Sequence, residues 1–237
     1  MAEGGDQEAQ GRPLLGYAVS GAIVLFSVVV VVIAVLSAGN ASSDDEDSDG
    51  VTSRSANGQV VELDVLPDGG VFARPREVDS VEEGAEAADC ELKSYDVESK
   101  DHISDPDEYV PRSSRPPTSG RHHPLPAQDG AYAVSPDVDS LVHTLEHGRV
   151  IVWFKRDLSR EARASLKAFY DHDRYQLLLV PDTTGMRYDV AATAWHGKPR
   201  PLGRGRLLGC PEYSDDVFTA LEAFKERNRG RGPELVP

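Results

Sequence analysis

A single uncharged apolar run near the N-terminus constrains this 237-residue chain more than any other feature of its sequence. The run extends from Leu14 to Ser37, and its 24 residues include no acidic or basic side chain. As a helix it would reach about 36 Å, enough to cross a hydrocarbon core of about 30 Å. The alternative is a cleaved signal peptide with a small-residue site at 39–41, but its apolar region is usually only about 7–15 residues. The length therefore predicts a transmembrane anchor over residues 14–38, with the membrane as a partner.

The charges divide the rest of the chain. Residues 39–110 contain 21 acidic and 5 basic residues, net −16, whereas residues 111–237 have a net charge of +3. The Ser, Asp and Gly residues that follow the apolar run have almost nothing to bury and are typical of a solvated spacer. Nucleic acid is not expected as a partner, because phosphate binding requires a dense cationic face. The predicted organisation is a cytoplasmic tail (1–13), the anchor (14–38), an acidic flexible linker (39–86) and an extracytoplasmic domain (87–237).

The two cysteines, Cys90 and Cys210, lie near the two ends of this domain. In an exported domain such a pair is typical of a disulfide, and two free thiols are the alternative. Closing so long a loop would remove about 4–5 kcal/mol of unfolded-state entropy on the simple chain model. We therefore predict a disulfide. Together with the single basic residue before the apolar run, Arg12, it favours a single-pass protein of the cell membrane whose domain lies outside the cytoplasm.

Hydrophobic periodicity predicts alternating helices and strands within the domain. A helix is expected to begin at Ser135, with Ser as N-cap and proline at the first position, and to end at Gly148. Further helices are expected over 158–172 and 215–227, and buried strands over 149–154, 175–180 and 190–195. Residues 91–112 read as irregular, and a short hairpin is expected within 60–72. This order predicts an α/β or α+β layered domain with a small mixed sheet, preceded by one transmembrane helix.

Two histidines carry the first chemical signal. His143 and His147 are four residues apart on a predicted helix, so both imidazoles can face one ion. With Glu146 they match the His-x-x-Glu-His pattern of inverted zinc peptidases, in which the glutamate activates water. That chemistry also needs a third, acidic ligand on a downstream helix, and none is evident. The alternative is that the two histidines only stabilise the negative end of the helix dipole.

Four motifs together resemble a known group of proteins. They are Pro116-Pro117-Thr118-Ser119-Gly120-x-His122, Asp129-Gly130-x-Tyr132, Val142-His143-x-Leu145-Glu146-His147-Gly148-x-Val150 and Ala192-x-Ala194-Trp195. Over residues 89–234 the chain resembles a bacterial family of secreted or membrane-anchored domains of unknown function. The resemblance implies a histidine upstream of the Pro-Pro motif, for which His102 is the match. Some members have a cysteine where this sequence has Asp129, so no thiol acts there.

Four histidines from three segments are then candidates for one metal site: His102, His122, His143 and His147. Four imidazoles can form a tetrahedral zinc site or a copper site. Met186 is a further candidate ligand whose thioether would favour copper, and a core position is its alternative. No catalytic residue is assigned, and an enzyme is not expected. The alternatives to metal binding are an envelope interaction module with an unidentified protein partner and, second, a zinc-dependent hydrolase of the His-x-x-Glu-His type.

Overall fold

The computed structural model describes residues 52–54, 60–62 and 66–234, apart from residues 98 and 106. The predicted cytoplasmic tail and membrane anchor lie outside these residues. In the part of the chain that is described, no helix is both long and apolar enough to span a membrane. The anchor over residues 14–38 therefore stays a prediction.

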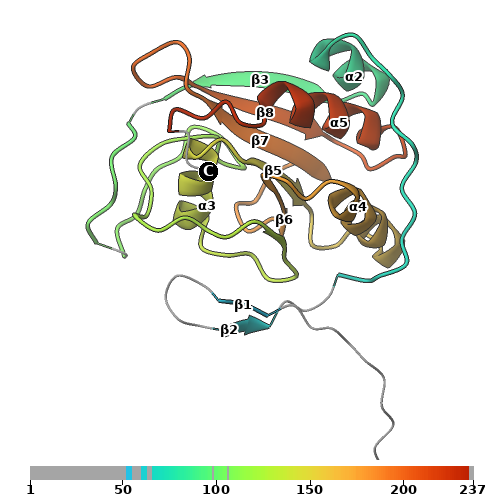
Figure 1. Cartoon of the computed structure of the whole chain (residues 1–237), viewed down its shortest axis with the longest axis horizontal. Helices are drawn as coiled ribbons and strands as arrows, with labels where there is room; N and C mark the ends of the chain where they lie inside the picture. Colours follow the sequence, from blue (N-terminus) through green and yellow to red (C-terminus); the bar gives the residue numbers. More distant parts are fainter. Residues whose placement is uncertain (1–51, 55–59, 63–65, 98, 106, 235–237) are drawn as a thin grey trace, which may run out of the picture. The chain divides into compact units, whose positions relative to one another are not determined.

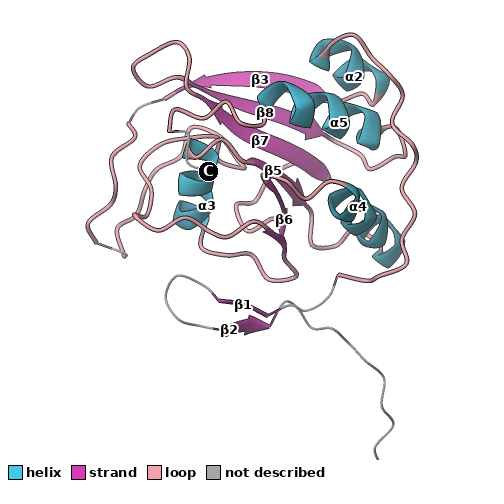
Figure 2. Ribbon diagram, in the orientation of Figure 1, coloured by secondary structure: helices cyan, strands magenta, loops and turns pink. Residues whose placement is uncertain are grey.

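A six-stranded mixed sheet organises the domain (Figures 1 and 2). Its strands, in spatial order, are β3 (Glu91–Asp96), β8 (Arg204–Cys210), β7 (Val190–His196), β5 (Val150–Phe154), β6 (Leu177–Pro181) and β4 (Gly130–Ala131). The first four are antiparallel to their neighbours, whereas β5, β6 and β4 run parallel. Helix α4 (Arg160–His172) connects β5 to β6, as a parallel pair requires. The predicted layered α/β domain with a mixed sheet is confirmed.

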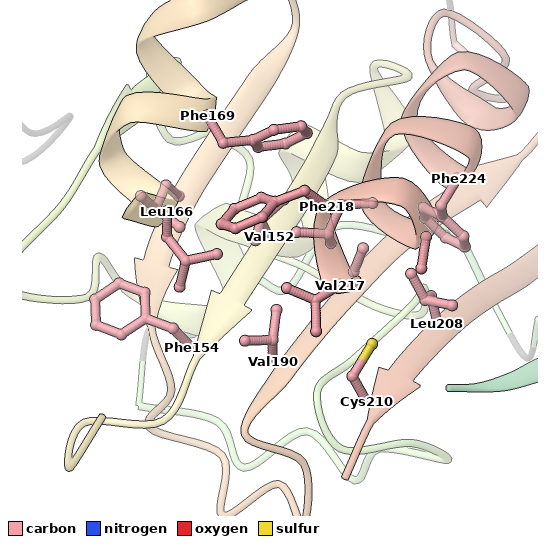
Figure 3. Packing of buried hydrophobic residues seen from close by; sticks show 14 of the residues in the cluster. Val152, Phe154, Leu166, Phe169, Val190, Leu208, Cys210, Val217, Phe218 and Phe224 are labelled. Carbon is pink, nitrogen blue, oxygen red and sulfur yellow. The ribbon is translucent and has the colours of Figure 1, made fainter. Parts of the chain in front are cut away.

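Both faces of the sheet are covered by helices. All residues of β5 are buried, and they alternate between two apolar clusters. Val152 belongs to a cluster with α2 (Val81–Ala87), α4 and α5 (Val217–Asn228), part of which is shown in Figure 3. Trp153 belongs to the opposite cluster with α3 (Val138–Glu146). Because successive side chains of a strand point to opposite faces, a strand covered on both faces is apolar throughout, as β5 is.

The N-cap residue predicted from the sequence is correct for α4 and wrong for α3. Ser159 caps α4 by accepting a hydrogen bond from the backbone N–H of Ala162. At α3 the N-cap is Asp137, which accepts from the N–H of Ser140, so the expected Ser135 cap was wrong. Asp137 is better placed because its carboxylate also interacts favourably with the positive end of the helix dipole.

Three expectations about the N-terminal part of the domain need correction. Residues 91–112 were expected to be irregular, but they begin with the edge strand β3. A hairpin was expected within 60–72, but among the described residues β2 (Val60–Glu62) pairs with the preceding β1 (Thr52–Arg54), and residues 66–72 contain no strand. Residues 66–86 were placed in a flexible linker, yet Leu66 and Ala85 are buried in the cluster around α5. The packed part of the chain therefore begins before residue 87.

The predicted disulfide is present. Cys90, just before β3, is bonded to Cys210, the last residue of β8, with 4.2 Å between their Cα atoms. Because β3 and β8 are also paired as antiparallel neighbours, the disulfide fastens the edge strand to the sheet at one end of their ladder. It joins residues 120 positions apart and so closes most of the domain.

Candidate metal centre

Helix α3 supplies two donors from one face. His143 and Glu146 are three residues apart, which places their side chains side by side on a helix. Both are buried, with 5% and 3% of their surface exposed. The apolar side of the same helix, with Leu141, Val142 and Leu145 fully buried, packs on the sheet and fixes the helix in place. The sheet thus determines where these two polar side chains lie.

The proline-rich loop before α3 supplies His122. Its Thr118 rests directly on the backbone of β8, because a Cβ at Gly205 would lie only 2.1 Å from the Thr118 hydroxyl oxygen. Gly120 adopts a φ of +116°, a conformation that favours glycine, and the chain turns there toward His122. The imidazole of His122 is completely buried and stands edge-on to the ring of Trp195.

Arg112 connects this loop to α3. Its guanidinium donates hydrogen bonds to the carbonyl oxygens of Ser119 and Arg121, at 3.4 and 2.7 Å. The same guanidinium forms an ion pair with Asp139 in the first turn of α3. One side chain therefore holds together the two segments that carry His122 and His143.

His102 comes from a third segment. The backbones of residues 101–103 and of His122 form an isolated parallel bridge, in which Ile103 N–H donates to the His122 carbonyl at 2.8 Å. His122 N–H donates in return to the Asp101 carbonyl at 3.3 Å. The bridge brings the His102 ring within 5.0 Å of the rings of both His122 and His143, measured between centroids. His102 is exposed, in contrast to the two histidines that it faces.

Three imidazoles and one carboxylate converge here. Donor atoms of His102, His122, His143 and Glu146 all lie within 4.8 Å of one another. A tetrahedral ion with bonds of about 2.0–2.2 Å spaces its donors about 3.4 Å apart, so contraction of the donor separations by up to about 1.4 Å would complete a shell. The group has the composition and nearly the spacing of a four-ligand metal site.

The hydrogen bonds of the buried histidines orient their second nitrogens. His143 Nδ1 lies 2.7 Å from the His123 carbonyl oxygen, and His122 Nδ1 lies 2.8 Å from the Gly120 carbonyl oxygen. A carbonyl only accepts, so each Nδ1 carries the proton and donates it. In a neutral ring the Nε2 atom then presents a lone pair, which is how a carbonyl fixes the tautomer of a metal-binding histidine.

The contact between His122 and Glu146 places a carboxylate against an imidazole in the buried part of the site. His122 Nε2 lies 3.0 Å from Glu146 Oε2, but the two atoms are not aligned as a hydrogen bond, and this Nε2 has no hydrogen-bond partner in the described residues. Burial by itself raises the pKa of the Glu146 carboxyl. The contact with His122, followed by electrostatic interactions with neighbouring groups, outweighs burial and holds this pKa below its ordinary value. A buried carboxylate beside an imidazole lone pair requires a cation between them, either a proton or a metal ion.

The remaining predicted ligands are placed differently. His147 Nε2 lies 3.0 Å from His143 Nε2, so His147 adjoins the donor group without being one of its four members. Burial lowers the pKa of His143 to about 4 and also lowers that of His147, so both rings are neutral near pH 7. Met186 is buried in the apolar cluster around α3. Its role as a ligand stays a prediction.

Glu146 is the donor that sequence reasoning assigned elsewhere. Its position in a His-x-x-Glu-His pattern directed attention to water activation. The spacing of three residues from His143 was the available signal, because it places a carboxylate on the face that carries the imidazole. The structure places Glu146 among the donors and His147 beside them.

Fold and site together define a mixed α/β domain with a buried group of histidine and carboxylate donors that could hold a metal ion. A family model described as "Protein of unknown function (DUF3105)" matches residues 104–234, more than half of the chain. The chain belongs to this family, so the expected membership in a family of domains of unknown function is confirmed. No curated protein and no solved structure matches the chain.

Proposed function

We propose that the domain binds one transition-metal ion through His102, His122, His143 and Glu146. The observation that carries the proposal is the buried contact between His122 Nε2 and Glu146, inside a group whose donors lie within 4.8 Å of one another. A metal ion neutralises the carboxylate and uses the imidazole lone pairs that the carbonyl hydrogen bonds direct inward. Binding of the ion would replace the hydrogen bond in which His143 Nε2 faces His147 Nε2 at 3.0 Å.

Zinc is the metal that this donor set fits first, and copper is second. Zinc accepts imidazole nitrogen and carboxylate oxygen in four-coordinate tetrahedral sites. Copper(I) prefers soft sulfur ligands. Both cysteines are in the disulfide, and Met186 packs in an apolar cluster, so the sulfur atoms of these residues have other surroundings.

The geometry favours holding the ion over hydrolysis. A hydrolase of the His-x-x-Glu-His type would bind zinc through His143 and His147 and leave Glu146 free to activate water. Here Glu146 belongs to the donor group and is buried. A site with four protein ligands has no open position for substrate. His102 is the exposed member of the donor group, so an ion would enter and leave the site past this residue.

We further propose that the domain is anchored in the cell membrane and lies outside the cytoplasm. The uncharged run from Leu14 to Ser37 and the disulfide support this location. Protease added to intact spheroplasts should digest the domain. Full protection of residues 87–237 would reverse the proposed orientation.

The metal proposal is tested by elemental analysis of the purified full-length chain after incubation with zinc and exhaustive dialysis. The wild type should retain about one zinc per chain, and His122→Ala should retain almost none. His172→Ala is the matched control, because His172 is exposed at the end of α4, and it should retain zinc as the wild type does. If the wild type retains no zinc, and no copper after a parallel incubation with copper, the domain is an envelope interaction module in which these histidines are structural.

A further inference from the structure

One cavity of the domain lies on the other face of the sheet from the histidine group. This cavity of about 180 Å³ opens between α2, α5 and the edge formed by β3 and β8. His196, the last residue of β7, lines this cavity, whereas the preceding Trp195 packs on the opposite face next to His122. The cavity and the histidine group are therefore separated by the thickness of the sheet.

The lining of this cavity is cationic although the chain as a whole is acidic. Lys93, Arg206 and Arg227 line it, and Glu82 is its one acidic lining residue. Lys93 is paired with Glu91 at 2.7 Å. Neither Arg206 nor Arg227 forms an ion pair with any acidic residue of the described ranges. No carboxylate of these ranges therefore neutralises the two guanidinium groups, and Arg206 donates a hydrogen bond to Ser94 in the same lining.

His196 adds a buried polar atom to the same wall. Its Nε2 is buried and has no hydrogen-bond partner among the residues that the structure describes. An unpaired buried polar atom is costly, so a ligand that pairs with it gains affinity. Burial, followed by the charges of Arg206, Arg231 and Arg227, lowers the pKa of His196 to about 4. The same three arginines would attract an oxyanion placed beside this ring.

The rest of the lining combines the polar residues Ser94 and Asn228 with apolar side chains. Val81 of α2, Leu92 of β3 and Phe224 of α5 face the cavity. A cationic end next to apolar walls fits a small molecule with an anionic head and an apolar body. We propose that this cavity binds a small organic oxyanion, whose phosphate or carboxylate head contacts Arg206, Arg227 and His196. Its apolar body packs against the three apolar residues.

Isothermal titration calorimetry on the full-length chain tests this proposal. The probes are phenyl phosphate, benzoate and inorganic phosphate, at constant ionic strength in chloride buffer, with benzylamine as the cationic counterpart. Phenyl phosphate or benzoate should bind, and whichever binds more tightly identifies the head group. Arg227→Gln should weaken this binding by about tenfold or more, because a charge-assisted hydrogen bond is lost. Arg206→Gln is the second variant, and it should have the same effect.

Arg156→Gln is the matched control, because Arg156 is exposed and lies outside the cavity lining. It should bind the probe as the wild type does, and so should His122→Ala, which affects only the metal site. The proposal is overturned if no aromatic oxyanion binds, if benzylamine binds as well, or if Arg156→Gln weakens binding as much as Arg227→Gln. Binding of inorganic phosphate without the aromatic probes would overturn the apolar part of the site.

Discussion

Replacing Glu146 with glutamine distinguishes a metal ligand from a structural ion-pair partner. The substitution keeps the shape of a side chain that is 3% exposed and removes its charge. Free zinc at about 100 times the dissociation constant stabilises a native state by about 2.7 kcal/mol. If losing the carboxylate weakens binding about 100-fold, the stabilisation at the same zinc concentration falls to about 0.4 kcal/mol.

These stabilisation energies correspond to measurable shifts in the melting temperature. For a domain of this size, about 1 kcal/mol shifts the melting temperature by roughly 2–4 °C. Zinc should therefore raise the melting temperature of the wild type by about 5–10 °C and that of Glu146→Gln by only about 1–2 °C. Differential scanning calorimetry of dialysed protein, with and without zinc, measures both values. Glu212→Gln, which removes an exposed carboxylate, should respond to zinc as the wild type does.

The competing explanation predicts a different pattern. If Glu146 only pairs with a protonated His122, glutamine breaks a buried ion pair and costs about 3–5 kcal/mol in zinc-free protein. Zinc would then leave the melting temperature of wild type and variant alike unchanged. A wild-type curve that zinc does not move would refute the metal-site reasoning, whatever the stability of the variant.

Three further predictions concern the disulfide, His196 and the loop that carries His122. Replacing Cys90 and Cys210 with alanine should lower the free energy of unfolding by about 4–5 kcal/mol, measured by urea denaturation, and an unchanged midpoint would contradict the role given to the disulfide. The pKa of His196 is about 4 in the fold and about 6.5 when unfolded, so its contribution to stability is complete above about pH 6.5 and is lost as pH falls toward 4. His196→Gln should therefore lessen the loss of stability between pH 7 and pH 4.5, and identical pH profiles would exclude this. Gly205→Ala should displace Thr118 and the loop that carries His122, so it should reduce the zinc-induced rise in melting temperature, and full retention of that rise would show that the loop tolerates the change.

The sequence predicted those elements whose apolar residues follow a clear local pattern. β5 and β6 are continuous apolar runs, and α4 combines a serine cap with a clear apolar stripe. β8 was missed because its Arg-Gly-Arg start lacks the alternation and the β-branched residues typical of strands. α2 was missed because it buries only Gly84 and Ala85, which let it approach Ala223 of α5 closely. Neither residue type marks a core helix in a sequence.

The candidate site was foreseeable to a similar degree. Helix geometry alone predicts that Glu146 and His147 lie on the same helix face as His143. The bridge that joins His102 to His122 does not follow from such geometry, because it pairs two irregular segments about twenty residues apart, and no local sequence pattern predicts that they pair. The position of Glu146 inside the group likewise depends on how α3 is rotated against the sheet, which only tertiary packing determines.

The coordination shell of bound zinc tests the central claim most directly. X-ray absorption at the zinc K-edge, on protein loaded with one equivalent of metal, reports the number and type of the nearest ligands. We expect four nitrogen and oxygen ligands at about 2.0–2.2 Å, three of them imidazoles that correspond to His102, His122 and His143. His122→Ala should reduce the imidazole count by one. A shell of about six oxygen atoms without imidazole scattering would show that zinc binds elsewhere and would contradict the account.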